Sequence, residues 1–224
     1  MLRKSVKHCG IRRGHTAPRD ETTLRGFAVI DPEVLYFGTP VAVVSTLNPD
    51  GTTNLAAMSS FWALADRFVL GLTSFGQTGA NLARCGECVL NFPSPREWQS
   101  VDRLGRTTGR ADLADYHRDS GIEFRPDKFA ASGFTPLASD IVKPLRVAEC
   151  PVQIEARLRA RHAAHEQPAL RYFEVQRLRV HASCEVVEPG TGRVDIHAWS
   201  PLFYLFRHYY GKGAFLGRSF RAKY

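Results

Sequence analysis

Two stretches of the chain alternate between hydrophobic and polar residues. Apolar side chains occupy every second position over 152–161 and again over 178–186, with charged or polar residues between most of them. Successive side chains of a β-strand point to opposite faces of a sheet, so a period of two predicts strands with one buried face. The intervening arginines follow from this geometry and need not form a nucleic-acid-binding stripe.

The first half of the chain predicts an antiparallel meander with one inserted helix. The run 41–47 is almost entirely apolar or β-branched, and Asn48-Pro49-Asp50-Gly51 after it fits a type I turn. Patterning and turn residues together predict these elements: strands over 41–47, 52–61, 68–73 and 88–92, and a helix over 78–84.

Three further segments have weaker patterns. An N-cap acid, a proline at the first helical position and an acid in the first turn predict a short helix over 32–37. The region 93–146 is rich in loop residues and is expected to form loops with amphipathic pieces at 112–118 and 126–131. The segment 201–211 is aromatic on too many faces for an isolated surface helix. We therefore expect it to be covered by another surface, for which a second subunit is the candidate.

About six antiparallel strands with few helices predict a mainly β fold, a small β-barrel with short helices. Closure of the sheet would remove its exposed edges. The chain has 224 residues, 44% of them hydrophobic, which is enough for one well-buried domain. No apolar run approaches the roughly 18 residues of a membrane-spanning helix, so no membrane partner is expected.

The net charge of +8 is concentrated near the N-terminus. Residues 1–25 carry seven basic and two acidic side chains, whereas the remainder carries 23 and 20. We therefore predict a basic flexible leader over 1–26 and a single domain over 27–224, and a nucleic-acid partner is disfavoured. The leader lacks the apolar run of a secretion signal, so a cytoplasmic location is expected.

The cysteines and histidines predict no metal site. Five cysteines are an odd number, and the pair Cys85-Gly-Glu-Cys88 closes a predicted helix, whereas a thioredoxin-type pair opens one. A zinc site would need a second such pair. His162 and His165 are expected in a surface loop between two strands. The sequence contains few recognisable catalytic motifs, and its residues identify no catalytic acid or base.

Two stretches carry the candidate chemistry, Asn54–Phe61 (NLAAMSSF) and Thr73–Leu82 (TSFGQTGANL). The second places hydroxyls and small residues before a helix start, which suits a phosphate. The first is a strand of small residues whose backbone could lie against a flat ring. Hairpin geometry would place the two on neighbouring strand ends, which suits a phosphorylated aromatic ligand. An ordinary Ser/Thr-rich turn with a helix cap is the alternative.

In order and spacing, the motifs resemble the flavin reductase-like, FMN-binding split-barrel proteins over roughly residues 27–217. Members commonly show a PVAVV(S/T)T strand, a D-G hairpin, N-x-A-x-x-S-x-F, a T-x-x-N helix start and a strand ending V-(V/L)-N-(F/L). The matching segments here are Pro40–Thr46, Asp50-Gly51, Asn54–Phe61, Thr78–Asn81 and Val89–Phe92, followed by Asp127-Lys128-Phe129, Gly133 and Ala148–Val152.

The resemblance implies an antiparallel, six-stranded split barrel that binds FMN. Asn54 belongs to the matching strand, and Ser59, Ser60 and Phe61 would line the isoalloxazine and ribityl chain. Ser74, Thr78 and Asn81 would hold the phosphate. Members usually have a charged residue just before the T-x-x-N threonine; this chain has Gln77, with Arg84 or a partner's arginine as the candidate substitute.

The implied activity is an NAD(P)H-dependent flavin reductase, in which nicotinamide transfers hydride to flavin N5. The protein would orient and desolvate the two rings, so no general base is required. FMN is the expected cofactor, with FAD as another substrate and NAD(P)H as the electron donor. The resemblance also implies a homodimer and leaves open a partner oxygenase that uses reduced flavin. The alternative is an FMN-binding electron carrier without nicotinamide turnover.

Overall fold

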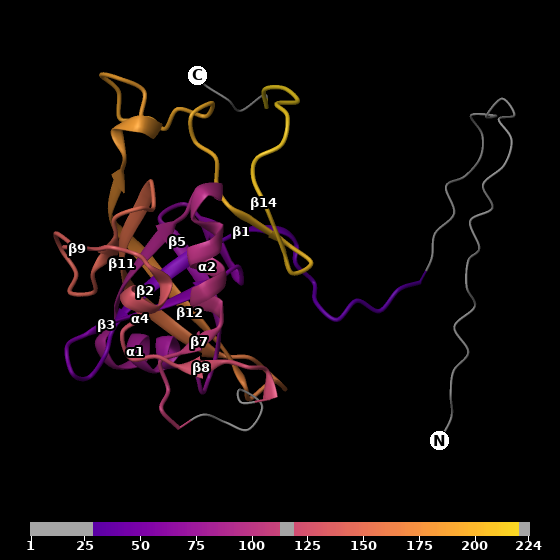
Figure 1. Ribbon diagram of the computed structural model, residues 1–224, viewed down its shortest axis with the longest axis vertical. Helices are drawn as coiled ribbons and strands as arrows, with labels where there is room; N and C mark the ends of the chain where they lie inside the picture. Colours follow the sequence, from indigo (N-terminus) through magenta and orange to yellow (C-terminus); the bar gives the residue numbers. More distant parts are fainter. Residues whose placement is uncertain (1–28, 113–118, 220–224) are drawn as a thin grey trace, which may run out of the picture. The chain divides into compact units, whose positions relative to one another are not determined.

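A computed structural model describes residues 29–112 and 119–219. The chain divides into a unit that ends at Glu33 and a folded unit that begins at Val34, and the second is mainly β (Figure 1). The first half contains β1 (Phe37–Pro40), β2 (Ala42–Leu47), β3 (Thr53–Met58), β4 (Phe61–Leu64), β5 (Arg67–Thr73), α1 (Gln77–Cys85), β6 (Glu87–Phe92), the 3₁₀ helix η1 (Pro95–Glu97) and α2 (Trp98–Gly105). The second half contains β7 (Thr107–Thr108), β8 (Glu123–Phe124), α4 (Lys128–Ser132), β9 (Pro136–Leu137), β10 (Arg146–Val147), β11 (Val152–Ala163), β12 (Leu170–Ala182), η2 (Cys184–Val186), β13 (Phe203–Leu205) and β14 (His208–Tyr210).

The main sheet contains seven antiparallel strands in the order β3-β2-β6-β11-β12-β5-β4. β3 and β4 form its two edges, yet only Ser59 and Ser60 separate them along the chain. The sheet must therefore curl until its edges approach each other. The ladders among the described residues include none between β3 and β4, so the barrel is open. The mainly β, split-barrel prediction is confirmed, with seven strands instead of six because the strand expected over 52–61 divides at Ser59-Ser60.

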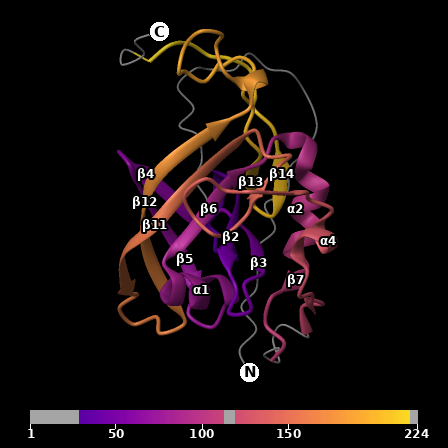
Figure 2. The same cartoon turned by 90° about the vertical axis from the view of Figure 1, so that its left-hand side faces the viewer.

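The near-continuous apolar run of β2 reflects burial on both faces. Val44 packs with Leu70 and Leu90 in the core inside the curled sheet. The neighbouring Val43 belongs to a second core with Leu104, on the side covered by α2. Figure 2 shows α2 and α4 together on that side of the sheet. A strand covered on both faces has no polar face, which is why its sequence does not alternate.

The turn after β2 has the predicted geometry. The N–H of Gly51 donates to the carbonyl of Asn48 across 3.1 Å, and Gly51 has a φ of 85°. That conformation favours glycine because it has no Cβ. The predicted strands 41–47, 68–73 and 88–92 and the helix over 78–84 are confirmed as β2, β5, β6 and α1, with shifts of one residue at most ends.

The strand predicted over 178–186 is misplaced. It runs from Leu170 to Ala182, and its deeply buried residues are Phe173 and Val175. β5 covers β12 only over 170–176. Beyond that point β12 pairs with β11 alone, and Val180 is 44% exposed although the alternation predicted it to be buried.

The helix expected over 32–37 is absent from the described residues, and the aromatic segment 201–211 is not helical either. The segment 32–37 leads directly into β1, which pairs with β13, and 201–211 forms the hairpin of β13 and β14. The N–H of Phe206 donates to the carbonyl of Tyr36 across 2.9 Å. Aromatic and β-branched residues have weak helix propensity, and the ladder satisfies their backbone groups instead. The C-terminal aromatic residues thus pack within this chain, with the ring of Tyr204 centred 5.4 Å from those of Tyr36 and Tyr209.

The remaining predictions concern the middle of the chain and its N-terminus. The amphipathic piece expected at 126–131 is α4, and α2 is a helix that the sequence patterns did not predict. The predicted leader over 1–26 and nearly all of the piece at 112–118 lie outside the described residues. No helix in the described part of the chain has the length and apolar character that crossing a membrane requires.

Candidate functional site

A cavity of about 300 Å³ lies between β3, the start of α1 and the segment that follows α2. Its lining residues are 54–58 of β3, 71–73 of β5, 76–79 at the start of α1, 107–109, Ile122 and Lys128. The volume is at the lower end of the range for small-molecule sites. None of these lining residues is acidic, and one is a lysine, so the cavity favours an anionic ligand.

The two stretches singled out in the sequence meet at this cavity. Asn54 of β3 is 2% exposed and Thr78 of α1 is 7% exposed. The Asn54 Nδ2 donates to the Thr78 Oγ1 across 3.2 Å. This bond joins a strand edge to a helix start that is 24 residues away in the sequence. Both residues line the cavity, as expected if the two stretches contact one ligand.

The start of α1 has no side-chain cap. Gly76 stands at the N-cap position with no capping hydrogen bond from a side chain, and no acid lies in the first turn. The first N–H groups of a helix have no intrahelical partner, and the helix dipole adds positive potential there. The cavity reaches residues 76–79, so these groups border it.

Asn81 and Ser74 do not line this cavity. Asn81 is 1% exposed, and its Nδ2 donates to Thr46 Oγ1 at 3.2 Å and to Asn48 Oδ1 at 2.8 Å. Its Oδ1 accepts from Gln77 Nε2 at 2.9 Å, so its amide is fully engaged in holding α1 against β2 and the turn. Ser74 lines a separate hollow of about 470 Å³ on another side of α1.

Ser59, Ser60 and Phe61 form the corner between β3 and β4. The Ser60 hydroxyl donates to the carbonyl of Gly71 across 2.7 Å, and the Phe61 ring packs edge-on against Phe92 at 5.9 Å. Ser59 is 8% exposed and lines a smaller cavity of about 220 Å³. Met58 lines both that cavity and the larger one, so the corner lies where the two adjoin.

Sequence reasoning assigned no role to two residues that line the 300 Å³ cavity, Gly109 and Lys128. A Cβ on Gly109 would lie 2.5 Å from Asn54 Oδ1 and 3.0 Å from Gln77 Cγ, so only glycine allows this close approach. Lys128 is 2% exposed, and burial lowers its pKa to about 7. No local signal marks Gly109, and the match of Asp127-Lys128-Phe129 to the family pattern marks that segment without giving the lysine a role.

The arginines near α1 have other partners. Arg84 lies in the last turn of α1, at the end opposite to Gln77, and its guanidinium donates to the carbonyl of Leu47. Arg110 forms an ion pair with Asp112 and donates to the carbonyl of Phe75 across 3.3 Å. Neither arginine lines the 300 Å³ cavity.

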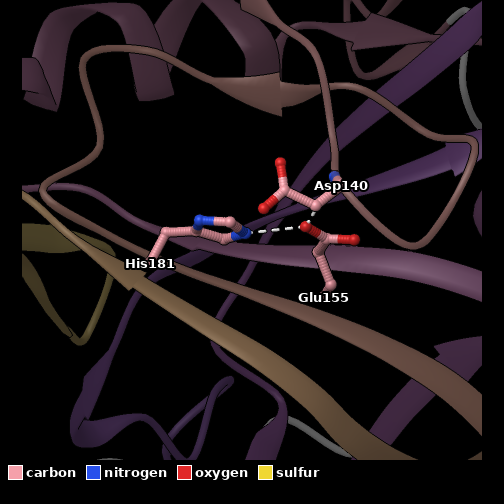
Figure 3. Close-up of side chains that lie close together, drawn as sticks. All are labelled: Asp140, Glu155 and His181. Atoms are coloured by element: carbon pink, nitrogen blue, oxygen red, sulfur yellow. Dashed lines mark hydrogen bonds and ion pairs between the residues drawn. The ribbon is translucent and has the colours of Figure 1, made fainter.

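A separate cluster joins Asp140, Glu155 and His181, as Figure 3 shows. Each carboxylate oxygen of Glu155 accepts two hydrogen bonds: Oε1 from the Asp140 N–H and from His181 Nε2, and Oε2 from the N–H groups of Ile141 and Val142. Burial alone would raise the pKa of Glu155, but these hydrogen bonds lower it to about 2. Asp140 also forms an ion pair with Arg179 at 2.6 Å. The carboxylate oxygens and the imidazole nitrogen that could bind a metal already have hydrogen-bond or ion-pair partners. The cluster therefore anchors the loop 140–142 onto β11.

The cysteine pair and the two histidines do not line the 300 Å³ cavity. Cys88 is fully buried in β6, where burial raises the pKa of its thiol to about 12 and makes it a poor nucleophile. Cys85 ends α1, and His162 and His165 lie at the tip of the β11–β12 hairpin.

Comparison with known proteins identifies the family. The model of the flavin reductase-like domain matches residues 34–213. The chain is 38% identical over 199 residues to the uncharacterized protein YdfE of Bacillus subtilis (strain 168), an alignment that spans 89% of this chain and 96% of that protein. Among solved structures, it is similar to the flavoredoxin of Desulfovibrio vulgaris (Miyazaki F), with a TM-score of 0.72, 22% identity and coverage of 88% of this chain and 99% of that one. The nitrilotriacetate monooxygenase component B from Bacillus cereus gives a TM-score of 0.69 and 18% identity, with 87% and 100% of the two chains covered.

Proposed function

The chain belongs to the flavin reductase-like family, and on that premise we propose that it is an FMN-binding oxidoreductase that works as an NAD(P)H-dependent flavin reductase. The observation that carries the proposal is the lining of the 300 Å³ cavity, which combines the uncapped start of α1 and a buried lysine with no carboxylate. Such a lining fits a ligand with a flat apolar body and an anionic end.

The residues present suit this cofactor. Thr78 and the first N–H groups of α1 would hold the phosphate, while Asn54 fixes the Thr78 hydroxyl. The small side chains of Ala56 and Ala57 leave room for a ring along β3. We also propose that the ring contacts the corner formed by Ser59, Ser60 and Phe61. This corner adjoins the cavity through Met58.

Asn81 and Ser74, which the sequence predicted as phosphate contacts, have secondary roles in the proposal because neither lines the cavity. Asn81 positions the start of α1 through Thr46 and Asn48 and contacts the phosphate only if it gives up one of those bonds. Ser74 would contribute from the loop before α1. The primary contacts are therefore Thr78 and the helix N–H groups.

The bound flavin would supply the chemistry, accepting hydride from a nicotinamide and passing electrons on. The protein would orient the two rings and exclude water around them. Neither task needs a general base, and the cavity lining contains no aspartate, glutamate or histidine. The seven-stranded sheet gives this site a rigid support, since β3 and β5 both line it.

The test is direct. Purified protein is mixed with FMN and either NADH or NADPH, and the loss of nicotinamide absorbance is followed. We expect turnover with at least one nicotinamide, with FMN and FAD compared as substrates. Flavin binding without turnover would reject the reductase, and the absence of flavin binding would reject the cofactor as well.

The comparisons support two uses for the electrons. The name of the Bacillus cereus protein, a monooxygenase component B, supports delivery of reduced flavin to a separate oxygenase. The flavoredoxin likeness supports the alternative of an electron carrier without nicotinamide turnover. Protein that copurifies yellow, ignores both nicotinamides and accepts electrons from a redox partner would favour the carrier. The predicted homodimer is part of the proposal and is tested by sedimentation analysis.

A further inference from the structure

We propose that Lys128 is the cation that binds the phosphate of FMN in this cavity. The inference rests on the proposed function, and it supplies the positive charge that Gln77 lacks. Its basis is the burial of Lys128, its single polar partner among the described residues and its place in the lining of the cavity that the start of α1 also borders.

Lys128 is buried, and the described residues provide it with no matching negative charge. Its Nζ, which carries three N–H donors when protonated, donates to the Thr107 hydroxyl at 2.5 Å, and no carboxylate of the described residues forms an ion pair with it. The adjacent Asp127 caps α4 by accepting from the Ala130 N–H at 3.0 Å. A buried ammonium with unused donors is unfavourable, and an anionic ligand would relieve that cost.

The charged groups on neighbouring elements do not supply this partner. Arg103 of α2 donates to the carbonyl of Ser132, and Asp102 pairs with Arg106. Glu123 of β8 pairs with Arg125, and β3 contains no titratable residue. The charge of Lys128 is therefore open to a ligand in the cavity that it lines.

A short path links Lys128 to the start of α1. Its partner Thr107 is two residues from Gly109, and a Cβ on Gly109 would lie 3.0 Å from Gln77 Cγ. Gln77 and Thr78 are the first residues of α1 and line the same cavity. The lysine and the start of α1 therefore border one cavity and can contact the same ligand, whereas Arg84 and Arg110 do not line the cavity.

This assignment predicts a specific pH dependence. Burial lowers the pKa of Lys128 to about 7 in the free protein. A bound phosphate dianion would favour the ammonium form and raise that pKa. FMN binding would then take up a proton above pH 7, and the affinity for FMN would fall as the pH rises. Riboflavin has the same ring without a phosphate, so its affinity would not follow this trend.

The experiment measures the dissociation constants of FMN and riboflavin by flavin fluorescence between pH 7 and pH 9. The proteins are the wild type, Lys128→Met and the control Lys143→Met, which removes an exposed lysine that does not line the cavity. We expect K128M to weaken FMN binding on the order of 10- to 100-fold at pH 7, since a hydrogen bond to a charged group is lost. Riboflavin binding by K128M, and FMN binding by K143M, should change by less than about threefold, because neither change removes a contact to the phosphate.

The wild type alone also tests the proposal. Its FMN dissociation constant should rise by up to about tenfold per pH unit above pH 7, with proton uptake measurable by calorimetry in two buffers. Equal losses of FMN and riboflavin in K128M would indicate a packing role and overturn the inference, as would FMN binding that does not change with pH. If the wild type binds neither flavin, the proposed function itself fails.

Discussion

Glu155 and Lys128 are both buried charges, with exposed fractions of 0% and 2%, but their surroundings differ. Glu155 has four hydrogen-bond donors around its carboxylate, and its pKa of about 2 means that the charged form is stabilised. Lys128 has one hydrogen-bond partner among the described residues, the Thr107 hydroxyl. Its pKa of about 7 means that its charged form is disfavoured. The number of partners thus separates a charge that supports the fold from one available to a ligand.

The largest expected effect is the loss of the Glu155 anchor. Glu155→Ala would leave three backbone N–H groups of the loop 140–142 and His181 without their acceptor, lowering the free energy of unfolding by about 3–5 kcal/mol. Glu174→Ala is the matched control on the same sheet, because Glu174 forms a half-exposed ion pair with Arg67, which should contribute less than about 1 kcal/mol. Urea unfolding measures both. Equal losses would contradict the role of the anchor.

Protonation of Glu155 by acid should also lower the free energy of unfolding, but by less than the Glu155→Ala substitution does. Its folded-state pKa lies below its unfolded value of 4.5, so its contribution is fully present above that value and is lost as the pH falls from about 5 towards 2. The wild type should therefore lose about 3 kcal/mol more than Glu155→Gln over this range. Thermal unfolding at a series of pH values measures the difference, and parallel curves would refute the low pKa.

Lys128 should also make the protein more stable as the pH rises, but because it loses its charge, whereas Glu155 gains one. The folded-state pKa of Lys128 lies below its unfolded value of 10.5, so the unfolded chain binds more protons between about pH 7 and 10.5, and stability rises with pH. The stability of the flavin-free wild type relative to K128M should rise by about 1 kcal/mol per pH unit between pH 7 and 9. Urea unfolding at each pH tests this, and no relative change would mean that Lys128 is not desolvated.

The smallest effects extend the contrast to neutral side chains. Asn81→Ala removes bonds to Thr46 and Asn48, so it should reduce stability by about 1–3 kcal/mol. Thr78→Ala should cost about 1 kcal/mol of stability and weaken FMN binding more than riboflavin binding, because its hydroxyl borders the cavity. If Asn81→Ala instead discriminated between the two flavins and Thr78→Ala did not, their roles would be exchanged. Denaturant midpoints and flavin titrations distinguish these outcomes.

The predictable parts of the fold are those whose signals are local. β2, the Asn48–Gly51 turn, β5, α1 and β6 each follow from a run of apolar residues or a turn motif within about ten positions. The errors occur where a distant segment decides the outcome. β12 is displaced because β5 covers only 170–176, and the segment 201–211 is a hairpin because β1 offers a ladder.

For the candidate site the division is similar. The stretches that contain Asn54 and Thr78 were recognisable from hydroxyls and small residues before a helix, and they do meet. The sequence did not reveal that Asn81 and Ser74 lie outside this cavity. For Asn81 the reason is that its amide bonds to Asn48 and Thr46, which are 33 and 35 residues away. The roles of Lys128 and Gly109 were not predicted, although Lys128 lies in a segment that matches the family, because these roles depend on what packs over the two residues.

The sequence by itself determined the family, the mainly β character and the two stretches that meet at the cavity, because strand periodicity, turn chemistry and helix starts are encoded by neighbouring residues. Only the tertiary structure decided that the strand over 52–61 bends at Ser59-Ser60 to connect both edges of an open barrel. It also decided which buried charge is satisfied and which is available. Burial and partner count depend on contacts between residues far apart in the chain, and no local pattern specifies them.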